Sequence, residues 1–193
     1  MLDESSRLSR RAFIWVATGL ALLVVAACFV LADDVLAGAV AATRDSARFS
    51  GLVMAAAVVA RAPRPAAWSM RRTELTLAFV AAHGVHFATV ILRALIEPGN
   101  KLRSFSLEVA LVVLLGFLLL ALVAATARAT SVAGRRANAI ALYTAWTVLA
   151  LASASRAATF LGSAVVLAAL SAALLWRIGS GMAERRVSPG AGT

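Results

Sequence analysis

The sequence is poor in the residues from which water-soluble proteins build their surfaces and reactive sites. Charged residues make up only 15% of the 193 positions, and there are one cysteine, one tyrosine and two histidines. The single thiol, Cys28, excludes a disulfide framework or a thiolate metal cluster built by one chain. A soluble domain of this length is also excluded, because a small globule cannot bury enough of a chain that is 62% hydrophobic.

Long apolar runs take the place of polar surface. A transmembrane helix needs about 20 mostly apolar residues, and such runs recur along this chain, whose mean hydropathy is +0.88. We therefore predict an all-α polytopic membrane protein, a bundle of six transmembrane helices in contact with the lipid bilayer. The predicted spans are 13–31, 49–60 (with its start a turn earlier), 75–95, 107–127, 138–155 and 159–178.

The first apolar run needs a check against secretion signals. Its stretch VAAC, residues 25–28, resembles a lipoprotein cleavage box. The run of about 20 residues is longer than the 7–15 of a signal peptide, which favours a retained first span. We thus divide the chain into a cytoplasmic N-terminal segment (1–12), a transmembrane domain (13–178) and a disordered cytoplasmic tail (179–193).

The net charge of +10 raises the question of nucleic acid binding. The basic residues lie between the spans without interleaved aromatics, so we predict contact with lipid headgroups and none with nucleic acid. Of the 19 Lys and Arg residues, 13 fall in the N-terminal segment, the second and fourth loops and the tail. The positive-inside rule then predicts both termini in the cytoplasm. Trp15, Trp68 and Trp176 fall near the same interface.

Both histidines lie in FVAAHGVHFATV, residues 79–90. His83 and His86 are three residues apart, so on a helix they share a face with about 4.5 Å of rise between them. An ionisable group in mid-membrane is costly and normally has a partner inside the bundle. Imidazole suits haem iron, copper or zinc, or a proton relay. A plain hydrogen bond to serine, threonine or a carbonyl of a neighbouring helix explains the pair equally well.

Two side chains on one face of a helix cannot clamp opposite faces of one haem. A five-coordinate haem needs one histidine, whereas a six-coordinate haem needs a second ligand from Met54, Tyr143 or a partner chain. Arg93 and Arg156 lie at the outer ends of spans. They are either interface anchors or partners of propionates or a polar headgroup, because guanidinium pairs bidentately with carboxylate.

Three stretches carry a family resemblance: RDSARFSGLVMAAAVVARAP, MRRTELTLAFVAAHGVHFATVIL and ATARATSVAGRRANAIALYTAWTVLALASASRAATF. Their order resembles that of the ferric reductase-like transmembrane domain, over about Arg44 to Arg177. The most specific piece runs from Arg71–Arg72 through LTLAF to His86, which matches the third-helix histidine of the family. The resemblance, to a group that includes small bacterial proteins, implies a six-helix bundle in a bacterial inner membrane. Such a bundle would bind b-type haem between its third and fifth helices and pass electrons across or within the membrane.

The chain departs from that family at one position. A histidine of the family follows the basic loop before the fifth helix, but GRRANAIALYTAW has none, and Ala141 lies near its place. The chain also has no flavin or nicotinamide domain, so an electron donor would be a separate protein or a quinol. We predict a haem b- or quinone-linked electron-transfer subunit, with His86 as the cofactor and metal ligand, His83 beside it and Arg93 at a propionate or headgroup. The alternative is a haem-free structural or partner-binding membrane protein.

Overall fold

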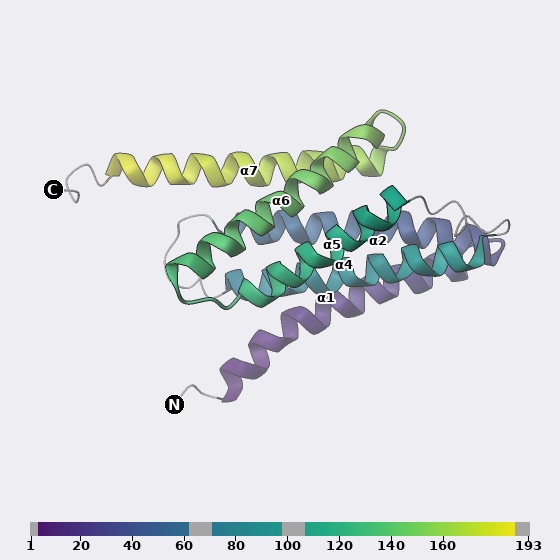
Figure 1. The fold of residues 1–193 in the computed structure, drawn as a ribbon, viewed down its shortest axis with the longest axis horizontal. Coiled ribbons are helices and arrows are strands. Elements are labelled where there is room, and N and C mark those ends of the chain that lie inside the picture. The colour runs from purple at the N-terminus through teal and green to yellow at the C-terminus, as the bar shows by residue number, and fades with distance from the viewer. Residues whose placement is uncertain (1–3, 62–70, 98–106, 188–193) are drawn as a thin grey trace.

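The computed structural model describes residues 4–61, 71–97 and 107–187, which form six α-helices (Figure 1). They are α1 (Glu4–Val30), α2 (Val35–Val59), α4 (Arg71–Ile96), α5 (Leu107–Thr126), α6 (Val132–Ala157) and α7 (Leu161–Val187). Each contains one of the six predicted apolar runs or most of it, and the described residues form no other regular element. The all-α class is therefore confirmed.

Four helices contain a stretch long and apolar enough to cross a membrane. The stretches are Ala12–Val30, Arg72–Ile96, Val132–Ala157 and Leu161–Ser180. In α5 the apolar stretch among the residues with described side chains, Leu114–Thr126, is shorter. The helices are those of an integral membrane protein in length and composition.

Helix α2 is much longer than the predicted span 49–60. It begins after Asp34, whose carboxylate accepts a hydrogen bond of 2.8 Å from a backbone N–H of the first turn. Charged residues near its middle, among them Arg44 and Asp45, ended the apolar window in the sequence. They do not end the helix, because alanine and arginine are strong helix formers and helix formation does not require an apolar surface.

Helix α7 also extends past its predicted edge at residue 178. It continues to Val187 and so includes residues 179–187 of the segment that we predicted as a tail. The sequence GMAERRV explains the extension, because alanine, methionine, glutamate and arginine favour helix. Residues 188–193 lie outside the described residues.

The helices form an elongated bundle, with the start of α1 and the end of α7 toward the same end (Figure 1). Helix α2 lies at its centre and packs most extensively against α4, while α1 contacts both, and α7 contacts α2 and α6. Helix α5 packs against α6 and α4. The buried core joins α2, α4, α5, α6 and α7; its largest members are Met54, Val58, Phe79, Leu142 and Leu170.

A glycine allows the close approach of α2 and α7. A Cβ atom at Gly51 would lie 2.6 Å from Cγ1 of Val166. Small residues at such contacts are typical of membrane helices, whose association depends on close packing rather than on expulsion of water.

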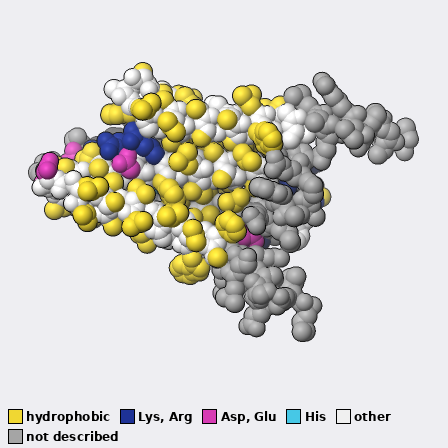
Figure 2. All heavy atoms as spheres, turned by 180° about the vertical axis from the view of Figure 1, so that it is seen from behind, with side chains coloured by type: hydrophobic (Ala, Val, Ile, Leu, Met, Phe, Trp, Pro, Cys, Tyr) yellow, Lys and Arg dark blue, Asp and Glu magenta, His cyan; other side chains and the backbone are white. Residues whose placement is uncertain are grey.

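The outer surface is apolar over most of the visible face (Figure 2). Trp15 on α1 is 72% exposed, Leu161 on α7 is 82% exposed, and Leu151 on α6 is 66% exposed. A soluble monomer rarely exposes contiguous apolar surface of this extent. Lipid is the environment that suits it.

Candidate functional site

The two histidines lie in a row of hydrogen bonds between α2 and α4, which we call the polar seam: Ser46, Ser50, His83, His86 and Thr89. The hydroxyl oxygen of Ser50 lies 2.9 Å from Nδ1 of His83, and that of Ser46 lies 3.2 Å from Nδ1 of His86. The serines are four residues apart and the histidines three, and the helices run in opposite directions. Both pairs therefore fall in register across the interface.

Thr89 completes the seam next to His86. Its Oγ1 lies 3.1 Å from the Ser46 hydroxyl and donates to the carbonyl of His86 at 2.7 Å, while Thr43 donates to the carbonyl of Thr89. Ser46 is fully buried and Thr89 is 4% exposed. The interhelical hydrogen bond to serine, one of our two explanations of the histidines, is therefore present for both.

The seam leaves one nitrogen of each imidazole for another role. The Ser50 hydroxyl has one proton and also lies 2.9 Å from the carbonyl of Ala47, which can only accept. When Ser50 donates to that carbonyl, Nδ1 of His83 donates to Ser50 and Nε2 keeps its lone pair. Ser46 has the same choice, because it lies 3.3 Å from the carbonyl of Thr43. The hydrogen bonds therefore allow the Nδ1–H form that a metal-ligating histidine usually adopts.

The two histidines differ in their surroundings. His83 is flanked by the rings of Phe79 and Phe87, with centroids 5.4 and 4.9 Å away. His86, 5.1 Å from His83, instead lines a cavity of about 420 Å³. His83 does not line it. Of the predicted pair, His86 and not His83 therefore lines this cavity.

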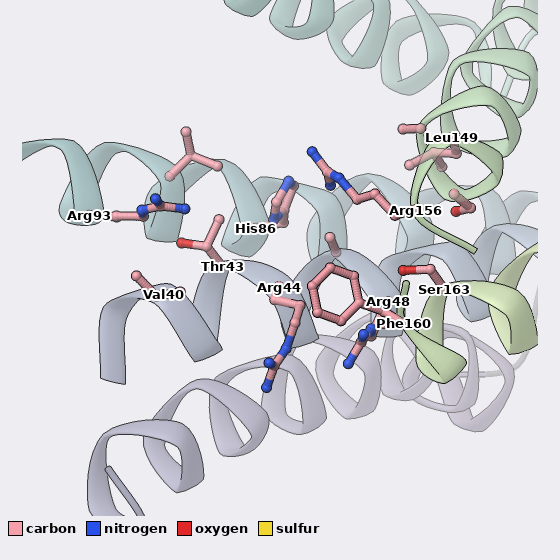
Figure 3. A pocket seen from close by; sticks show the side chains of 14 residues that line it. Val40, Thr43, Arg44, Arg48, His86, Arg93, Leu149, Arg156, Phe160 and Ser163 are labelled. Atoms are coloured by element: carbon pink, nitrogen blue, oxygen red, sulfur yellow. The ribbon is translucent and has the colours of Figure 1, made fainter. Parts of the chain in front are cut away.

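This space, which we call the outer cavity, lies between α2, α4, α6 and α7 (Figure 3). Apolar and small side chains make up part of its wall, including Val90, Leu149 and Phe160. The rest is strongly basic. Its charged and imidazole side chains are His86, Arg44, Arg48, Arg93 and Arg156.

Two carboxylates neutralise part of this charge. Asp45 pairs with Arg44 at 2.9 Å and with Arg48 at 2.8 Å. Glu97 lies 3.6 Å from Nε of Arg93. Arg156 forms no ion pair with the carboxylates of the described residues. In Figure 3 its guanidinium projects from α6 toward the ring of His86, so the cavity has an excess of positive charge next to the imidazole.

The structure thus brings together three residues that the sequence identified separately: His86, Arg93 and Arg156 all line the outer cavity. Sequence reasoning did not single out Arg44 and Arg48 as site residues. Their i,i+4 spacing within an alanine-rich stretch was the available signal, because it puts both on one helical face.

The other residues considered as haem ligands lie elsewhere. Met54 is fully buried in the core, and Tyr143 lines a different pocket. Ala141, near the place of the histidine of the ferric reductase-like family, is buried in the core. Within the described residues there is no group of three or more His, Cys, Asp or Glu side chains that could hold a metal ion.

Comparison with known proteins adds no relative. No protein-family model matches the chain, and no curated protein or solved structure matches it either. A function must therefore be proposed from the residues of the chain itself.

Proposed function

We propose that the chain is a six-span bundle of a bacterial inner membrane, with both termini in the cytoplasm, that binds an acidic, membrane-soluble ligand in the outer cavity. One observation carries the proposal. Four arginines and a histidine line this cavity, and the two carboxylates that pair with three of the arginines, Asp45 and Glu97, do not line it. Charged side chains of membrane helices that face a cavity normally have a functional partner.

The six-span topology requires α2 to cross the membrane with its charges. Asp45 shares its carboxylate between Arg44 and Arg48, which both line the outer cavity, and Asp45 itself contacts Cys28 of α1. Paired charges that face a bundle interior or a cavity are the form in which a membrane span tolerates them. At 25 residues, α2 is long enough to span the hydrocarbon layer.

The side chains define how an acidic ligand would bind. A guanidinium presents a planar fork that matches a carboxylate or a phosphate bidentately. Arg156 would be the main contact, because it has no ion pair among the described residues. His86 would add a contact through Nε2, and Val90, Leu149 and Phe160 would hold an apolar tail. A quinone, which bears no charge, would leave the arginines uncompensated and fits less well.

Haem b is a second candidate, favoured because His86 and two arginines share one cavity. His86 would supply an axial nitrogen while its Nδ1–H donates to Ser46, and Arg93 and Arg156 would pair with the propionates. Bound haem would supply one-electron chemistry, with a separate redox protein as donor. Neither Met54 nor Tyr143 lines the cavity, so neither would supply a sixth ligand to a haem bound there. If haem b binds here, the chain would share its cofactor with the ferric reductase-like family that its sequence resembles.

A thermal-shift titration of detergent-purified protein with decanoate tests the main proposal, with uncharged decanol as the control ligand. We expect saturable stabilisation by decanoate alone. Arg156→Gln should weaken the affinity about tenfold, because a charge-assisted hydrogen bond contributes about 1.5 kcal/mol. Arg128→Gln is the matched control, because Arg128 is exposed and does not line the outer cavity. Equal stabilisation by decanol, or equal affinities of the two variants, would refute the proposal.

Absorption spectra with added haemin, oxidised and dithionite-reduced, test the second candidate. We expect a Soret band that His86→Ala abolishes and His83→Ala retains, since His83 does not line the cavity. A wild-type protein without the band would eliminate haem and leave the acidic-ligand proposal intact. Failure of both titrations would favour the haem-free structural protein, in which the histidines only hold α2 against α4.

A further inference from the structure

A second basic site lies at the opposite end of the bundle, where α2 ends and α4 and α6 begin. This pocket, which we call the inner basic pocket, has a volume of about 270 Å³. Five arginines line it together with the ring of Tyr143: Arg61, Arg72, Arg135, Arg136 and Arg177. They come from the end of α2 and from α4, α6 and α7, so the fold rather than a local run of sequence assembles them.

Arg61 is the most buried arginine that lines this pocket. It is only 8% exposed, and one of its terminal nitrogens donates a hydrogen bond to Oδ1 of Asn138. Asn138, itself 4% exposed, donates from Nδ2 to the carbonyl of Val123 and to Oγ1 of Thr126, both at 3.0 Å. The amide is thereby fixed by α5, and it orients the guanidinium. A buried arginine held by a neutral amide keeps its full positive charge uncompensated.

The arginines have donors without acceptors. The Nε atoms of Arg61, Arg72 and Arg177 are buried and form no hydrogen bond. Within the described residues none of the five arginines forms an ion pair, and Glu74, two residues from Arg72, forms none either. Burial, followed by the nearby charge of Arg72, lowers the pKa of Arg61 to about 10. Buried donors without acceptors are costly, and the acceptor oxygens of an anion would satisfy them.

The start of α6 adds to the positive potential. Ser131 caps this helix by accepting a hydrogen bond from the N–H of Gly134, and Arg135 and Arg136 follow in its first turns. The N-terminal end of a helix carries a partial positive charge that favours anions. The dipole and the guanidinium groups therefore act in the same direction at the rim of the pocket.

We propose that the inner basic pocket binds the phosphate group of an anionic ligand. A phosphate offers several strong acceptor oxygens to a cluster of guanidinium groups, which a single carboxylate cannot do. In the proposed orientation the pocket faces the cytoplasmic leaflet, where basic pockets between helices bind lipid headgroups. The phosphate belongs either to such a lipid or to a soluble anion from the cytoplasm.

Native mass spectrometry and thermal shift of the detergent-purified full chain test this proposal with three probes: dioleoyl phosphatidic acid, dioleoyl phosphatidylcholine and inorganic phosphate. The double variant R135Q/R136Q changes two rim residues that are exposed, so it should fold. Arg128→Gln is the control, because it is exposed and outside the pocket. We expect the double variant to bind the anion about 25-fold more weakly, since each basic side chain near an anionic headgroup contributes about fivefold.

Each outcome either decides whether the pocket binds phosphate or identifies where the phosphate comes from. Binding of phosphatidic acid over phosphatidylcholine, lost in the double variant and insensitive to millimolar phosphate, identifies a lipid headgroup. Stabilisation by inorganic phosphate that competes with the lipid identifies a soluble phosphate ligand. Equal binding of both lipids without stabilisation by phosphate, or equal loss in Arg128→Gln, overturns the proposal. The variants separate this proposal from that for the outer cavity: R135Q/R136Q changes residues that line only the inner basic pocket of the two, and Arg156→Gln changes a residue that lines only the outer cavity.

Discussion

The contact between Gly51 and Val166 predicts that one added methyl group separates α2 from α7. The Cβ of Gly51→Ala would lie 2.6 Å from Cγ1 of Val166, about 1 Å closer than carbon atoms pack. Valine in a helix keeps one χ1 rotamer, so its Cγ1 cannot turn away at low cost. Overpacking of this kind costs about 1–3 kcal/mol, partly offset by the higher helix propensity of alanine. We expect Gly51→Ala to destabilise the bundle by about 1–2 kcal/mol.

Reversible unfolding by sodium dodecyl sulfate in mixed micelles, followed by circular dichroism, measures this free energy. Gly84→Ala is the matched control, because a Cβ at Gly84 meets no described atom within 4 Å. It should be neutral or stabilising. Val166→Ala removes the clashing methyl, so the double variant Gly51→Ala/Val166→Ala should be more stable than the sum of the single effects predicts. Additivity within about 0.5 kcal/mol, or equal effects at Gly51 and Gly84, would refute the assigned contact.

Two further predictions concern the polar seam and the topology. Ser50→Ala removes the hydrogen-bond partner of His83 and should lower the free energy of unfolding by about 0.6 kcal/mol, at most about 1.7, in the same titration. Ser180→Ala, which removes a hydrogen bond within one helix, should lower it less. Equal losses in the two variants would contradict the polar seam. In a Cys28→Ser background, a cysteine at Thr130 should be labelled by an impermeant maleimide only from the cytoplasmic side of membrane vesicles and a cysteine at Thr159 only from the other side. Labelling of both from one side would exclude the six-span topology.

The sequence predicted the helical class well but the extent of α2 poorly. Hydropathy reports the local cost of moving a segment into lipid, and that cost is visible in long runs such as those of α1 and α7. In α2 the cost of Arg44, Asp45 and Arg48 depends on their pairing with one another. Such pairing depends on side-chain geometry, which a sum over residues omits. The predicted apolar span therefore covered only the second half of α2, a helix of 25 residues.

The residues of the candidate sites were likewise predicted only in part. The sequence identified His86, Arg93 and Arg156 as unusual, because single polar residues stand out in apolar helices. It could not place them in one cavity, since that depends on which helices are neighbours. Arg61 was hidden for another reason: it follows α2 directly and looks like an ordinary interface cation. Its burial follows from the position of Asn138 on α6, 77 residues away.

The packing of α1, α2 and α4 has a consequence for how the protein is made. Helices α1, α2 and α4 contact one another, and every member of the polar seam lies before residue 97. The seam can therefore close while the second half of the chain is still on the ribosome. In the proposed six-span topology, α2 with its charged cluster would enter lipid least readily by itself, and the histidines of α4 would pair with its serines. We expect the membrane insertion machinery to release this hairpin as a unit, with α7 docking onto α2 as the last step of assembly.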